Sequence, residues 1–77
     1  MGKKQTKKLL RTGELAKMSG ARLSTLKYYS EIGILPFEQE GVRLTRRYDK
    51  AKALKRLQEI RRLREQGLSV EEIRKRF

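Results

Sequence analysis

The sequence contains no cysteine and no histidine, the side chains that proteins use most often for disulfides, thiol chemistry and zinc binding. Those functions are excluded for these 77 residues, and no metal or cofactor is expected. A chain of this length forms at most one domain with a small core. Its 9 Asp and Glu residues are scattered among basic residues, and no glycine-rich phosphate loop is present, so we do not expect an enzyme.

Long hydrophobic runs are also missing. The longest apolar stretch, near residues 32–37, is interrupted by Gly33 and Pro36 and cannot span a bilayer. Only Leu9 and Leu10 follow the N-terminal lysines, which is too little apolar sequence for a signal peptide. We therefore expect a cytoplasmic protein associated with the nucleoid.

Negative charge is scarce, because Lys and Arg number 21 against 9 Asp and Glu, for a formal net charge of +12. An excess of this size indicates a polyanionic partner, most simply double-stranded DNA, with an anionic membrane surface as the alternative. The membrane is the poorer alternative, because the basic segments lack the broad leucine or aromatic face that inserts into lipid.

Two short helices across a glycine turn are predicted in the first half of the chain. Thr12 is a candidate N-cap for a helix over residues 13–18, Gly20 suits the turn, and a second helix is expected over residues 23–31. This pattern is typical of a helix-turn-helix, whose second helix usually enters the major groove of DNA.

A small β wing is predicted to follow the second helix. Residues 35–37 and 43–48 can pair as a two-stranded hairpin around residues 38–41. Two short strands are marginally stable alone, so this wing must pack on a helix, with Leu44 and Tyr48 as the expected anchors.

Two further helices complete the prediction. Asp49 is the expected N-cap of a helix over residues 50–66 that stops at Gly67, and Ser69 and Glu72 form a capping box for a last helix. The apolar residues of the long helix spread over a broad arc that several neighbours can contact: Ala51, Leu54, Leu57, Ile60 and Leu63.

The predicted fold class is therefore mainly α with a small β wing, a winged helix-turn-helix of about four helices and a two-stranded hairpin. We divide the chain into a basic flexible arm over residues 1–8 and a winged helix-turn-helix domain over residues 9–77. Two interpretations of the arm remain open, a solvated tail and a segment that becomes ordered on phosphates.

Six blocks of sequence occur in a distinctive order and spacing: Thr12-Gly-Glu-Leu-Ala16, Thr25-Leu-Lys-Tyr-Tyr29, Ile32-Gly-Ile-Leu-Pro36, Arg46-Arg47-Tyr48, residues 57–67 and residues 68–73. Together they resemble the MerR (mercury-resistance-regulator) family of winged helix-turn-helix proteins over about residues 9–77. The resemblance implies a DNA-binding domain with its second helix in the major groove and its wing on the flanking backbone.

The resemblance also implies partners. Full-length members usually continue into a long dimerising helix and often an effector domain, so a homodimer is expected of a full-length form, and RNA polymerase is a partner if the protein regulates transcription. Neither region follows Phe77, which leaves two alternatives, a fragment of a longer regulator or a minimal protein that pairs in another way.

The candidate DNA contacts come from the second helix, the wing and the long helix. Leu23 and Leu26 lie three residues apart and are expected to face the core, which leaves neighbouring side chains outward. The candidates are Arg22, Ser24, Thr25, Lys27, Tyr28, Arg43, Arg46, Arg47 and Arg64.

Each candidate has a chemical rationale. Arg22 can bind guanine through two hydrogen bonds, whereas Lys27 more often contacts phosphate, and the Ser24 and Thr25 hydroxyls suit either. The family resemblance implies backbone contacts for Tyr28 and Arg64.

Some candidates also have structural alternatives. Ser24 can serve as a helix cap, and Arg22 and Arg64 can be solvated charges. One wing arginine can pair with Glu38, Glu40 or Asp49. Ser24 and Lys27 also stand where many family members have Arg, so base preference cannot be carried over.

The leading hypothesis is a sequence-specific double-stranded DNA-binding domain of a MerR-like transcription regulator. The first alternative is a small DNA-architectural or excisionase-like recombination factor. The second is a winged helix that docks an acidic protein, against which the large basic excess counts.

Overall fold

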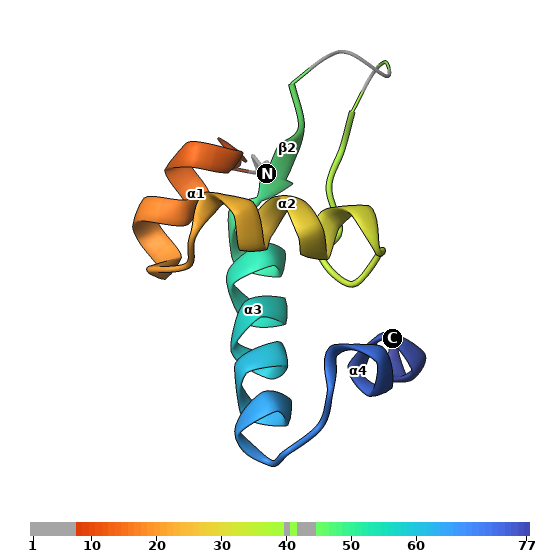
Figure 1. Ribbon diagram of the computed structural model, residues 1–77. Helices are drawn as coiled ribbons and strands as arrows, with labels where there is room; N and C mark the ends of the chain where they lie inside the picture. The colour runs from red at the N-terminus through yellow and green to blue at the C-terminus, as the bar shows by residue number, and fades with distance from the viewer. Residues whose placement is uncertain (1–7, 40, 42–44) are drawn as a thin grey trace, which may run out of the picture.

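The computed structural model describes residues 8–39, 41 and 45–77, and the residues predicted as the basic arm fall, but for Lys8, outside this part. The described elements follow in the order β1 (Leu9–Arg11), α1 (Thr12–Ser19), α2 (Leu23–Glu31), β2 (Arg47–Asp49), α3 (Lys50–Glu65) and α4 (Val70–Arg76). Figure 1 shows α1 and α2 around one end of α3, with α4 near its other end. The predicted fold class, mainly helical with a small β element, is confirmed.

The helix-turn-helix forms through local backbone bonds. Gly20 adopts φ 78°, a left-handed conformation that favours glycine, and its N–H donates to the Ala16 carbonyl at 2.9 Å. Helix α2 has the predicted limits. Helix α1 differs slightly, because Thr12 is its first residue and not its cap, and the Glu14 carboxylate accepts the Arg11 N–H at 2.9 Å.

The strand partners differ from those predicted. Strand β2 pairs with the N-terminal strand β1 in an antiparallel sheet, with Leu10 opposite Tyr48. Among the described residues the backbones of the two sides of the wing pair at one isolated bridge, where Glu38 and Arg47 exchange hydrogen bonds of 2.7 and 2.8 Å. The predicted anchor Leu44 lies outside the described residues.

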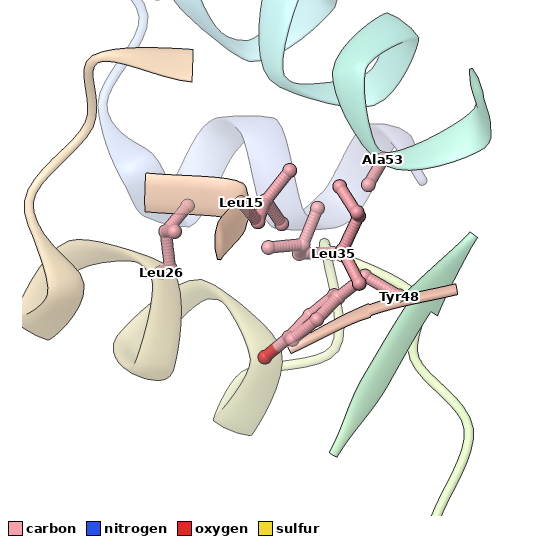
Figure 2. Packing of buried hydrophobic residues seen from close by; sticks show 6 residues of the cluster. Leu15, Leu26, Leu35, Tyr48 and Ala53 are labelled. Carbon is pink, nitrogen blue, oxygen red and sulfur yellow. The ribbon is translucent and has the colours of Figure 1, made fainter. Parts of the chain in front are cut away.

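The main core surrounds Tyr48, which is completely buried as predicted. Figure 2 shows its ring among Leu15, Leu26, Leu35 and Ala53, with the hydroxyl directed toward α2. Ser30 Oγ donates to the Leu26 carbonyl at 2.8 Å and accepts the Tyr48 hydroxyl at 2.7 Å, so both buried hydroxyls are paired.

A second core cluster joins α3 to α4 and to the segment after α2, through Ile34, Ile60 and Ile73. The Asp49 carboxylate caps α3 by accepting the Lys52 N–H at 3.1 Å, as predicted. The predicted capping box of α4 is confirmed, with bonds of 2.8 and 3.1 Å between Ser69 and Glu72.

The first residue of α3 that packs in the core is not the predicted one. Ala51 is exposed and Ala53 is buried, whereas Ile60 is buried as expected. Ala53 belongs to the main core cluster with residues of α1, α2 and both strands, and the periodicity of α3 alone does not reveal this packing.

Tyr48→Phe is expected to lower the free energy of unfolding by about 1 kcal/mol, because it removes one buried hydrogen bond while the ring keeps its packing. Tyr28→Phe is the matched control, since the Tyr28 side chain is exposed. Urea denaturation followed by far-UV circular dichroism measures both variants. Equal stability of Tyr48→Phe and the unmodified protein would contradict a structural role for the Tyr48 hydroxyl.

Candidate nucleic-acid interface

Helix α2 turns one face to the core and the other to solvent. Leu26 and Ser30 are buried, while Ser24, Lys27 and Tyr28 are exposed. The end of the helix is held by backbone bonds from Ile34 and Leu35 to the Tyr29 carbonyl, at 3.1 and 3.2 Å. The outer face therefore sits on a helix that is fixed by the core and by the segment that follows.

The polar side chains on the outer face of α2 are not used in interactions within the described part of the chain. Arg22, Ser24, Thr25 and Lys27 form no side-chain hydrogen bond or ion pair with any described residue. The N-cap of α2 is Arg22, and no side chain caps this end, so the capping alternative for Ser24 is wrong. These groups are available to a partner.

An open hollow of about 380 Å³ lies where α2 faces the end of α3 and the start of α4. Its lining joins three predicted residues of α2 to Arg64 of α3: it consists of Ser24, Thr25, Tyr28, Tyr29, Arg64 and Val70. The rings of Tyr28 and Tyr29 lie 6.1 Å apart with a 44° tilt. Arg22 and Lys27, by contrast, do not line this hollow.

Sequence reasoning missed two members of this lining. Tyr29 was not among the candidate contacts, and it is half-buried, packing on both core clusters while it also borders the hollow. Val70 was not among the candidates either. Its position depends on how α4 packs on α3, and no local pattern carries that information.

The wing arginines differ from one another. The Arg46 guanidinium lies 3.8 Å from the Glu31 carboxylate and 5.0 Å from the centre of the Phe37 ring, and its side chain is only 25% exposed. Glu31 is not among the partners predicted for a wing arginine. Arg47 is exposed, and Arg43 lies outside the described residues.

Leu23 is a further difference from the prediction. It was expected to face the core with Leu26, but 44% of it is exposed whereas Leu26 is fully buried. A separation of three residues turns the helix about 60° short of a full circle, and at the first turn of α2 that difference brings Leu23 out of the core.

The chemistry of this surface suits a polyanion. It offers guanidinium, ammonium and hydroxyl donors, which are the groups that contact phosphates and base edges. Among the described residues no three of His, Cys, Asp and Glu lie close enough together to hold a metal ion. In the same part of the chain, every helix is too short or too polar to cross a membrane.

Residues 10–77 match the family model of the MerR HTH family regulatory protein. The chain therefore belongs to the MerR family of helix-turn-helix regulatory proteins, a membership that supports a DNA-binding transcription regulator. The resemblance found in the sequence is thereby confirmed.

Two curated relatives are both called Nodulation protein NolA. The protein from Bradyrhizobium elkanii is 40% identical over 65 residues, which cover 84% of this chain and 29% of the relative. The protein from Bradyrhizobium sp. (strain NC92) is 38% identical over 65 residues, covering 84% of this chain and 27% of the relative. The chain thus spans less than a third of the length of either relative, and no solved structure matches it significantly.

Arg46→Ala is expected to lower the free energy of unfolding by about 0.5–1 kcal/mol, through loss of the contact with Phe37. The pair with Glu31 adds little, because the Glu31 side chain is 63% exposed and the separation is long at 3.8 Å. Arg47→Ala, which removes the same charge from the adjacent exposed residue, should leave stability nearly unchanged. Urea titrations of both variants test this difference, and equal effects of the two substitutions would contradict it.

Proposed function

We propose that this chain is a sequence-specific double-stranded DNA-binding domain of a transcription regulator, with α2 in the major groove and the wing on the flanking backbone. The observation that carries the proposal is the hollow that joins Ser24, Thr25 and Tyr28 of α2 to Arg64 of α3. Side chains distant in sequence form one surface there, next to the exposed start of a fixed helix.

The hollow has the chemistry of a phosphate contact. The Tyr28 hydroxyl is a donor on an exposed side chain, and the Arg64 guanidinium adds a charge at the same edge of α2. With a backbone phosphate in this position, the start of α2 faces the base edges, as in other helix-turn-helix proteins.

The two sides of the surface have different roles in this proposal. Arg22 and Ser24 are at the start of α2, where base contacts are made, the Thr25 hydroxyl bonds a base or a phosphate, and Lys27 neutralises a phosphate. Arg47 contacts the backbone from the wing together with Arg43. Arg46 stabilises the wing, because its guanidinium contacts the Glu31 carboxylate and the Phe37 ring.

A module of this size buries roughly 600–1,000 Å² on DNA, which gives weak binding to a single half-site. We therefore propose that the regulator acts as a homodimer, with RNA polymerase as its functional partner and the cytoplasmic nucleoid as its location. We assign dimerisation and any effector binding to the whole protein.

Selection of bound duplexes from a random-sequence DNA pool at about 150 mM salt is expected to enrich one motif, because non-specific binding is weak at this ionic strength. A two-fold-symmetric motif supports a paired promoter regulator, and a single half-site supports a monomeric reading domain. Recovery of no motif would refute sequence-specific binding and favour the architectural or protein-docking alternative.

Arg64→Gln is expected to weaken binding to all sequences and to reduce the slope of log K against log salt by about one, because it removes one phosphate contact. Arg62→Gln makes the same change of charge at an exposed residue of α3 that does not line the hollow. Fluorescence anisotropy across a salt series compares the two variants. An equal loss of slope would show that general charge, and not the hollow, determines the contact.

A further inference from the structure

Leu23 is an apolar side chain at the place where a DNA-reading helix begins. It is the first residue of α2 and is 44% exposed. Arg22 before it and Ser24 after it are both exposed polar residues without a side-chain partner among the described residues. Exposure of this leucine to water is unfavourable in free energy, and a partner that buries the side chain removes that penalty.

The geometry of α2 separates Leu23 from the hollow. Successive helical residues are 100° apart, so Leu23 and Lys27 lie on one flank of α2, and Thr25 and Tyr28 lie on the other, with Ser24 between them. In agreement with this arrangement, Ser24, Thr25 and Tyr28 line the hollow, and Leu23 and Lys27 do not. When a backbone phosphate occupies the hollow, the flank of α2 that carries Leu23 therefore faces the floor of the major groove or the wall of the groove opposite that phosphate.

The chemistry of the major groove then limits what Leu23 can contact. Base edges there present hydrogen-bond donors and acceptors, and their one apolar group is the C5-methyl of thymine. A leucine against donors, acceptors or phosphates would remove water from polar groups without replacing their hydrogen bonds. Contact with a methyl group instead buries apolar surface on both sides.

We propose that Leu23 is a specificity-determining residue that recognises the C5-methyl group of a thymine in the major groove. This inference rests on the proposed function, since it requires α2 to lie in the groove. It assigns a base preference to a residue that sequence periodicity had assigned to the core. It also makes recognition at that base pair independent of hydrogen bonding, in contrast to the role proposed for Arg22.

The test replaces each thymine of the selected duplex, one at a time, by uracil, which lacks only the C5-methyl group. Binding of the unmodified protein is measured by fluorescence anisotropy. At one thymine per half-site the dissociation constant is expected to rise about fourfold, the equivalent of one buried methyl group. At the other positions uracil is expected to bind as thymine does.

Variants of Leu23 assign that methyl contact to this side chain. Leu23→Ala is expected to bind thymine and uracil duplexes equally, and Leu23→Gln, which keeps a long side chain but ends it in a polar amide, provides a second loss of apolar contact. Met18→Ala is the matched control, because Met18 is 49% exposed and lies in the last turn of α1, outside α2. It should retain the fourfold preference for thymine. Circular dichroism confirms that each variant is folded.

The outcomes separate this inference from the proposed function. A specific site at which no thymine is sensitive to uracil, or whose sensitivity persists unchanged in folded Leu23→Ala or Leu23→Gln, overturns the role of Leu23 alone. Failure of the unmodified protein to select any site overturns sequence-specific DNA binding and this inference with it.

Discussion

Tyr48 joins most of this fold through one buried side chain and the backbone around it. Its ring packs in the main core, and its hydroxyl bonds to Ser30 of α2 at 2.7 Å. Its backbone lies opposite Leu10 of β1, and the next residue, Asp49, caps α3. The position of α2 relative to α3 therefore depends on this residue. The hollow depends on the same relation, because its lining comes from α2, α3 and the start of α4.

The parts of the fold that the sequence predicted are those set by contacts within a few residues. A cap such as Asp49 or Ser69 satisfies backbone N–H groups two or three positions ahead, so residue type and spacing are sufficient to locate it. Gly20 marks its turn because the left-handed conformation favours glycine. These short-range bonds explain why α2 and the starts of α3 and α4 were placed correctly.

The features that were missed depend on which elements meet. Strand β1 has three residues and acquires its pairing only from β2, so no alternation identifies it. Arg46, just before β2, lies 3.8 Å from Glu31 at the end of α2, a contact that local charge spacing does not reveal. Among the candidate DNA contacts, the residue types were apparent from the sequence. Their grouping was not, because Arg64 meets α2 only through the packing of the helices.

Pairing of β1 with β2 has a consequence for the order in which a nascent chain can fold. The ribosome makes β1 before the helix-turn-helix and the wing, but its partner strand is made only after both. Leu10 therefore cannot pair until Tyr48 has been synthesised. Their pairing closes a long loop, and the chain entropy lost in that closure is a separate step from the formation of the local helices. Helices α1 and α2 can form early, yet α2 is fixed in place only when the sheet closes and α3 begins. Translation must thus pass the wing before the outer face of α2 is fixed in place.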